Sequence, residues 1–310
     1  MKVVFCGTPQ FAVPSLERLV SEGFAVQLVV TQPDRPQGRG MELTAPPVKQ
    51  TALRLGLPVV QPEKIKNNLE FREQLASLQP DAIIVVGYGR IIPAWMLELP
   101  PLGNINVHGS LLPKYRGAAP IQWAIACGET VTGVTTMRLD EGLDTGDILL
   151  QREMPIQPDD TAVTLAPRMA VIGADLLIET LRGLEQRTVH RIKQDNARAS
   201  LAPILKKEDA LVDFNRSAAE IHNRMRGFQP WPGAYAQFRG KNLKILAAHP
   251  ATDAPRLSPA ELLSSGGKLF VGCGGSSVLE LRQVQLEGKK AMSAHDFAIG
   301  HRLAPGERLG

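Results

Sequence analysis

The sequence predicts an α/β protein in which a mostly parallel sheet, covered by helices on both faces, is followed by a small C-terminal β-barrel. Two observations favour the sheet. Continuous apolar runs of strand length occur at residues 3–6 and 82–86, and segments with a helical period alternate with them. Short strand signals from residue 234 onward favour the barrel. A chain of 310 residues also exceeds the usual size of a single core, so we expect two domains.

The elements of the first half follow this alternation of strands and helices. We expect strands at residues 2–7, 25–30, 57–62, 81–86 and 105–110, and helices at 15–22, 48–55, 68–78 and 118–127. Residues 32–47 read as a long loop rich in Pro, Gly and Arg without an apolar period, and such loops are usually functional or disordered. Because active sites in parallel sheets lie beyond the carboxyl ends of the strands, residues 87–93 and 105–110 are of particular interest.

The second half begins with a strand of alternating character and an acidic loop over residues 131–147. Residues 161–182 predict a long amphipathic helix with Pro167 near its first turn. Residues 185–205 lose the apolar period, and we expect two domains, at 1–188 and 207–310, joined by a linker at 189–206. The second of these should contain a helix at 217–226 and strands at 234–238, 242–248, 268–273 and 278–284.

Composition narrows the classes of protein that fit. Cys6, Cys127 and Cys273 are widely scattered, which argues for a reducing cytoplasm and against a disulfide framework or a metal site. The chain opens with an apolar run too short for a signal peptide, and no apolar segment approaches the roughly 18 residues of a membrane span. Residues 1–205 hold 20 Lys and Arg against 21 Asp and Glu, whereas residues 206–310 hold 15 against 10. The basic C-terminal part favours a polyanionic partner such as nucleic acid, although a merely solvated basic surface fits the charge equally well.

The stretch NINVHGSLLPKYRGAAP, residues 104–120, carries the strongest signal for chemistry. Asn106 and His108 are two residues apart, so an extended backbone points both side chains to one face. Asp144 follows a strand that could neighbour theirs, and an aspartate can orient a histidine and favour its protonated form. Together the three groups could stabilise an oxyanion, or they could be buried polar groups that satisfy one another. A Ser110 nucleophile and a metal at His108 are much weaker hypotheses, and neither GxGxxG nor GxxxxGK[ST] occurs.

With GVTTMRLDEGLDTGD downstream, this stretch closely resembles the formyltransferases that use 10-formyltetrahydrofolate. The finer resemblance is to the methionyl-tRNA formyltransferase family. It rests on VVFCGTPQFAVPSL, TQPDRPQGRG, GYGRIIP, FQPWPGAY and EGKKAMSAHDF, which occur in the expected order over nearly the whole chain. The resemblance implies a Rossmann-like catalytic domain and an OB-like C-terminal barrel that binds tRNA.

The resemblance also implies an activity and a set of site residues. The formyl group would pass from 10-formyltetrahydrofolate to the α-amine of methionyl initiator tRNA, with Asn106 and His108 stabilising the oxyanion and Asp144 holding His108. The folate co-substrate would lie against two turns, made of Gly87, Tyr88, Gly89, Arg90, Ile91 and Ile92, and of Ser110, Leu111, Leu112 and Pro113.

For the tRNA, Arg39 resembles the family's arginine that enters the acceptor stem, where shape rather than base sequence is read. Further candidates for phosphate contacts are Lys206, Lys207, Arg239, Lys241, Lys289 and Lys290, each of which could instead be a solvated surface charge. Two other functions stay open: a formyltransferase acting on a small amine, such as glycinamide ribonucleotide or an amino sugar, and a non-catalytic tRNA-binding protein. We expect a cytoplasmic monomer without a metal.

Overall fold

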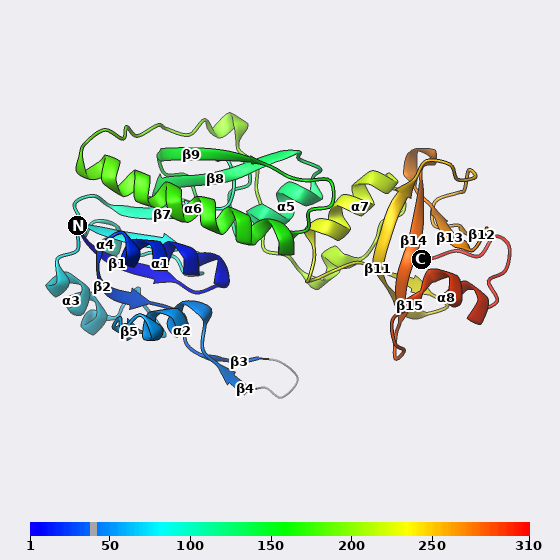
Figure 1. Ribbon diagram of the computed structural model, residues 1–310, viewed down its shortest axis with the longest axis horizontal. Coiled ribbons are helices and arrows are strands. Elements are labelled where there is room, and N and C mark those ends of the chain that lie inside the picture. The colour runs from blue at the N-terminus through cyan, green and yellow to red at the C-terminus, as the bar shows by residue number, and fades with distance from the viewer. Residues whose placement is uncertain (38–41) are drawn as a thin grey trace. The chain divides into compact units, whose positions relative to one another are not determined.

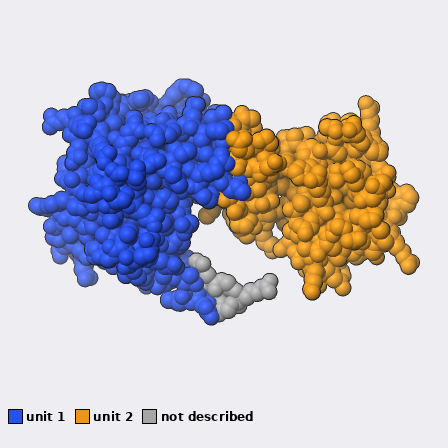
Figure 2. Space-filling view, in the orientation of Figure 1, with its two compact units in different colours: residues 1–120, 131–155, 164–203 blue, residues 121–130, 156–163, 204–310 orange. Residues whose placement is uncertain are grey.

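The computed structural model describes residues 1–37 and 42–310 and divides the chain into two compact units (Figures 1 and 2). Unit 1 consists of residues 1–120, 131–155 and 164–203, and unit 2 of residues 121–130, 156–163 and 204–310. In the described part of the chain, no helix is long and apolar enough to cross a membrane.

Unit 1 is built on a seven-stranded sheet with the order β5-β2-β1-β6-β7-β8-β9. The first five strands in this order are parallel, whereas β8 is antiparallel to β7 and β9 is antiparallel to β8. The mostly parallel sheet predicted from the continuous apolar runs is therefore confirmed. Its strands are β1 (Lys2–Gly7), β2 (Ala25–Val30), β5 (Val59–Val60), β6 (Ala82–Val86), β7 (Asn104–His108), β8 (Val131–Arg138) and β9 (Ile148–Pro155).

Helices cover both faces of this sheet, also as predicted. On one face α3 (Leu69–Leu78) and α4 (Ala94–Leu97) share a core cluster with the inner strands, through residues such as Val4, Cys6, Ile83 and Val85. On the other face lie α1 (Val13–Ser21) and α6 (Ala162–Glu185), which Figure 1 shows on the same side and which Arg18 and Asp175 join in an ion pair. The remaining helix of unit 1 is α2 (Pro47–Arg54).

Four features of unit 1 differ from the sequence expectation. The expected loop at 32–47 contains a two-stranded hairpin, β3 (Arg35–Gln37) with β4 (Glu42–Thr44), which leaves Pro36 and Leu43 exposed and so shows no apolar alternation. α4 and β9 were not expected, because one is a single turn and the other buries few residues. α6 begins at Ala162, so Pro167 lies in its second turn rather than its first, where it has no N–H to donate to the Val163 carbonyl.

Unit 2 carries an antiparallel sheet with the order β10-β11-β14-β13-β12, and β15 pairs with β14. Its strands are β10 (Tyr235–Phe238), β11 (Lys241–Ala251), β12 (Leu262–Ser265), β13 (Lys268–Gly272), β14 (Val278–Leu286) and β15 (Met292–Ser293). The helices are α5 (Pro120–Ala126), α7 (Ala218–Gly227) and α8 (Ala294–Gly300). The sequence analysis did not predict α8, β12 or β15. Short 3-10 helices are η1 (Gln10–Ala12) and η2 (Asn196–Arg198) in unit 1, and η3 (Lys207–Ala210) and η4 (Gly274–Ser276) in unit 2. The C-terminal antiparallel β domain is confirmed.

Residues 307–310 link the two edges of this sheet. The Leu262 N–H donates to the Glu307 carbonyl (2.7 Å) on the β12 side, and the Gly310 N–H donates to the Gln237 carbonyl (3.0 Å) on the β10 side. The sheet therefore curls round far enough for one short segment to bond to both edge strands.

Unit 2 also includes two short stretches from the middle of the chain, residues 121–130 and 156–163. The Trp123 ring of α5 packs edge-on against Phe228 at 5.3 Å between centroids. The Arg226 guanidinium of α7 donates to the Asp160 carbonyl at 2.7 Å. These contacts hold residues 121–130 and 156–163 to α7 and the turn that follows it.

A close approach of α6 to the sheet can be tested at Gly173. A methyl group there would lie 2.9 Å from Val107 Cγ1. Although alanine is normally favoured over glycine in a helix, we expect Gly173→Ala to lower the free energy of unfolding by about 1–3 kcal/mol through overpacking. Urea denaturation measures this change.

The matched background is Val107→Ala, which removes the methyl group that would clash. In that background Gly173→Ala should become neutral or stabilising, so the double-mutant cycle should show favourable coupling. Additive effects would contradict the packing of α6 on β7.

Candidate active site

Asn106 and His108 project from β7 on the face that α4 covers. The Asn104 side chain donates to the Met96 carbonyl of α4 (2.8 Å), and alternate residues of a strand point the same way. Asn106 and His108 are only 8% and 5% exposed. Within the described residues the Asn106 amide makes no hydrogen bond, so its N–H groups are available to a ligand.

Asp144 reaches His108 by an indirect route. As expected, β8 neighbours β7, but the antiparallel register pairs His108 with Thr135 and Ile105 with Arg138. The loop after Arg138 therefore starts at the amino end of β7 and folds back over the sheet. There Asp144 Oδ2 lies 3.7 Å from His108 Nδ1 and accepts the Gly117 N–H at 2.8 Å. The structure thus brings the two titratable residues of the predicted trio together.

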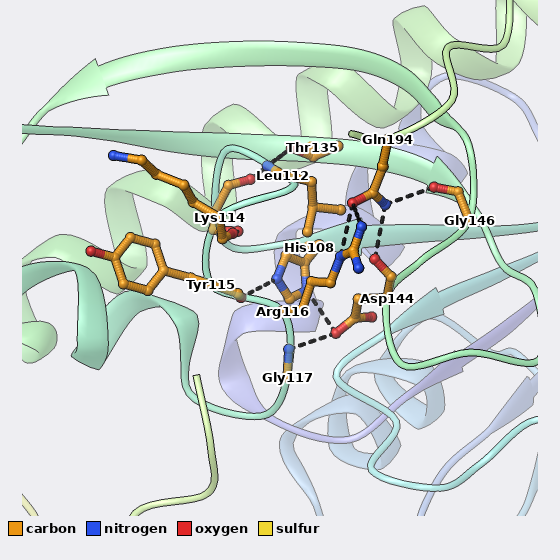
Figure 3. Close-up of polar contacts among 11 residues, drawn as sticks. His108, Leu112, Lys114, Tyr115, Arg116, Gly117, Thr135, Asp144, Gly146 and Gln194 are labelled. Carbon is orange, nitrogen blue, oxygen red and sulfur yellow. Dashed lines mark hydrogen bonds and ion pairs between the residues drawn. The ribbon is translucent and has the colours of Figure 1, made fainter. Parts of the chain in front are cut away.

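The second ring nitrogen of His108 also has a partner (Figure 3). His108 Nε2 lies 2.9 Å from the Tyr115 carbonyl, and because a carbonyl only accepts, Nε2 carries a proton. Tyr115 reaches this position with a left-handed backbone, at φ +61°. A carboxylate therefore lies beside one ring nitrogen and a carbonyl beside the other, and the two contacts set the orientation of the ring.

The turn at Ser110–Pro113 is fixed from the neighbouring strands. Thr135 Oγ1 donates to the Ser110 carbonyl (2.7 Å) and accepts the Leu112 N–H (3.1 Å), while Gln151 Nε2 donates to the Leu112 carbonyl (2.9 Å). Ser110 is fully buried and its hydroxyl donates to the Lys114 carbonyl, so it is not placed as a nucleophile. Leu112 lies in a core cluster, whereas Leu111 and Pro113 are half-buried.

The turn after β6 presents backbone rather than side chains. Gly87 and Gly89 are exposed and have positive φ angles of 56° and 76°. The Tyr88 side chain is buried in the core, where desolvation raises the pKa of its hydroxyl. The Tyr88 carbonyl already accepts from Thr8 Oγ1 and Gln32 Nε2. Of the other residues predicted here, Ile91 is 88% exposed, Ile92 is half-buried, and Arg90 Nε donates to Gln32 Oε1.

Part of the expected linker lies against the same site. Ile192 forms a β-bridge with Ile148, and Arg116 forms one with Leu201. The side chain of Gln194 lies between Arg116 and the loop that carries Asp144 (Figure 3). Sequence reasoning did not select Thr135, Gln151, Arg116 or Gln194. Arg116 stood in the quoted motif, but single polar residues in a strand or loop give no signal before the tertiary contacts are known.

Basic residues gather at one end of the sheet of unit 2. Asn242 and Glu287 bond to each other through backbone groups, so the turn before β11 lies beside the turn after β14. These turns and the first residue of β11 carry four exposed basic side chains, Arg239, Lys241, Lys289 and Lys290. Arg239 is paired with Glu307 (2.6 Å), whose carboxylate raises the pKa of Arg239. Lys206 and Lys207 are exposed at the start of η3, and Arg39 lies outside the described residues.

Over residues 1–37 and 42–310, no group of three or more His, Cys, Asp and Glu side chains is arranged to hold a metal ion. The three cysteines are unpaired, and burial raises the pKa of the Cys273 thiol to about 12.

Comparisons with known proteins agree in both halves of the chain. Residues 1–181 match the formyl transferase family, and residues 204–302 match the formyl transferase C-terminal domain. Two curated methionyl-tRNA formyltransferases are each 64% identical over 310 residues, covering all of this chain. One is from Koribacter versatilis, with 99% of its own length covered, and the other is from Acidobacterium capsulatum, with 100% covered. A similar fold is seen in an N-formyltransferase from Helicobacter canadensis, solved with folinic acid and dTDP-3-aminofucose. That structure gives a TM-score of 0.67 at 21% identity over 91% of this chain and 98% of the other.

Proposed function

This chain belongs to the methionyl-tRNA formyltransferase family, and from this premise we propose that it formylates the α-amine of methionine carried by initiator tRNA. The formyl donor is 10-formyltetrahydrofolate, and the product is N-formylmethionyl-tRNA for translation initiation. The observation that carries the chemistry is the unpartnered, buried Asn106 amide on the strand face that also bears His108, with Asp144 beside the ring.

The folate supplies a formyl group that the amine nitrogen attacks. A C–N bond forms, the formyl oxygen gains negative charge, the C–N10 bond then breaks, and the proton lost by the amine is balanced by one gained at N10. Asn106 donates its free amide N–H to the charged oxygen, which a preorganised donor in a buried site stabilises strongly. Asp144 lies beside His108 Nδ1 and orients the imidazole toward the same place.

One contact must change for His108 to donate directly. Its Nε2–H is directed at the Tyr115 carbonyl at 2.9 Å, so the oxyanion has to replace that carbonyl as acceptor. The Asp144 carboxylate beside Nδ1 sets the orientation of the ring in which this exchange of acceptors takes place.

The residues of the two turns fit a flat heterocycle rich in donors and acceptors. Exposed backbone at Gly87 and Gly89 and the exposed Ile91 side chain offer polar groups beside an apolar surface. The Ser110–Pro113 turn is held rigidly by Thr135 and Gln151, which suits a site that must fix the position of a formyl group.

The tRNA would be bound largely through unit 2. The division of labour that we propose assigns catalysis to residues 1–188, a connection to 189–206 and tRNA binding to 207–310, in a cytoplasmic monomer. Exposed Lys241, Lys289 and Lys290 support this assignment, and Lys206, Lys207 and Arg239 are further candidates. Arg239 would have to give up Glu307, or act with it, to contact a phosphate.

A substrate panel tests the proposed function. The purified protein with labelled 10-formyltetrahydrofolate should formylate methionyl initiator tRNA faster than methionyl elongator tRNA, glycinamide ribonucleotide or an amino sugar nucleotide. Formylation of only the small amines would replace the tRNA assignment, and tRNA binding without any transfer would identify a non-catalytic binder.

Two substitutions test the roles of the charged pair. We expect His108→Ala and Asp144→Asn to keep the fold and to lower the single-turnover rate of formyl transfer by about 10²–10³, as the loss of one oxyanion-stabilising group does. Asp144→Asn keeps the side-chain shape and a residue that tolerates positive φ. Single-turnover rates within threefold of the unsubstituted protein, with unchanged circular dichroism, would refute these roles.

The basic end of unit 2 predicts a salt-dependent affinity for tRNA. Replacing Lys241, Lys289 and Lys290 together by Ala should weaken tRNA binding and lower the slope of log K against log[salt] by up to about 3. The matched control replaces the exposed Lys64 and Lys66 of unit 1, and its slope should stay unchanged. Filter binding at several salt concentrations measures both, and equal slopes for the two variants would argue against this surface.

A further inference from the structure

We propose that Gln194 is a positioning residue for Asp144, a role that rests on the proposed function of the site. One flat side-chain amide makes four hydrogen bonds there (Figure 3). Its Nε2 donates to the Asp144 carbonyl (2.8 Å) and to the Gly146 carbonyl (2.7 Å). Its Oε1 accepts from Arg116 Nε (3.0 Å) and from an Arg116 terminal nitrogen (2.8 Å).

The orientation of the amide follows from its partners. Both loop groups are carbonyls, which only accept, and the guanidinium only donates. Glutamine presents two donors on one atom and an acceptor on the other at the required reach. Glutamate, which has a similar shape, retains the acceptor for Arg116 but has no N–H for the loop. The site thus needs the amide rather than a polar side chain in general.

The loop needs such a support because its backbone is unfavourable at the functional residue. Asp144 has φ +51°, a left-handed conformation that is uncommon outside glycine. The bonds from Gln194 fall on the Asp144 carbonyl itself and on the carbonyl two residues later. On the other side, the Asp140 carboxylate accepts from the Gly142 N–H and from the Thr145 hydroxyl. The residue that faces His108 is therefore held from both directions.

Arg116 extends this support to the second loop at the site. It is only 6% exposed and is held by the amide oxygens of Gln194 and Asn196. Its own backbone bonds to the Ser200 carbonyl (2.8 Å) and to the Ala202 N–H (2.7 Å). The two residues that flank it act on the trio directly, since the Tyr115 carbonyl contacts His108 and the Gly117 N–H contacts Asp144.

Gln194 thus couples the two loops that determine how His108 is held. The distance between His108 Nδ1 and Asp144 Oδ2 is 3.7 Å, longer than a hydrogen bond, so the pair is sensitive to small shifts of either loop. Losing the amide frees the Asp144 backbone without removing any group that touches the substrate. The expected effect is on the rate of transfer and not on the binding of folate or tRNA.

Gln194→Glu and Gln194→Ala test this role against the matched control Asn196→Ala, which removes a partner of Arg116 but no contact to the Asp144 loop. We expect both Gln194 variants to lower kcat about 10- to 100-fold with KM values for folate and tRNA within threefold. The loss for Asn196→Ala should be at least tenfold smaller. Equal losses in the Gln194→Ala and Asn196→Ala variants, or an unchanged kcat in Gln194→Glu, would overturn the proposal.

A second measurement does not depend on activity. Amide hydrogen exchange of residues 140–147 should become faster in both Gln194 variants and stay unchanged in Asn196→Ala. Unchanged exchange in the Gln194 variants would also overturn the positioning role. If the unsubstituted protein formylates none of the amines tested, the proposed function fails, while the exchange experiment still decides whether Gln194 holds the loop.

Discussion

The antiparallel pairing of β8 with β7 is the constraint on which the candidate site depends. Had β8 been parallel to β7, its following loop would lie at the carboxyl end of the sheet, where such loops usually contribute to a site. The observed register instead pairs Ile105 with Arg138, so the loop has to return over the sheet face before Asp144 can approach His108. The left-handed backbone at Asp144 and the bonds that hold it are consequences of this return.

The sequence predicted those helices and strands whose burial produces a pattern of apolar residues. The apolar runs of β1 and β6 are continuous because helices cover both faces of these strands. The helical repeat of apolar residues along α6 reflects the packing of one of its faces on the sheet. β9 and β12 escaped notice because several of their residues face away from the core. The hairpin of β3 and β4 is held by backbone pairing with exposed side chains, which no apolar pattern records.

The same distinction applies to the site. Asn106, His108 and Asp144 could be selected because their chemistry is unusual at strand ends and because the surrounding motif resembles a known family. Thr135 and Gln194 could not, since their importance depends on which carbonyl groups the fold places within reach. Arg239 shows the reverse case. It was predicted from the sequence to contact nucleic acid, but it forms an ion pair with Glu307, in the segment that bonds to both edge strands.

The interleaving of the two units has a consequence for synthesis on the ribosome. Residues 121–130 and 156–163 flank the β8–β9 hairpin, yet they pack with α7 and the residues after it, as Trp123 does on Phe228. A nascent chain that ends near residue 203 can form the sheet of unit 1 while both flanking stretches lack their packing partners. Trp123 then lacks the Phe228 ring on which it packs in the complete fold. Co-translational folding of this chain is thus not strictly vectorial from one unit to the next. A nascent-chain chaperone would find its binding segments at residues 121–130 and 156–163, near the middle of the chain.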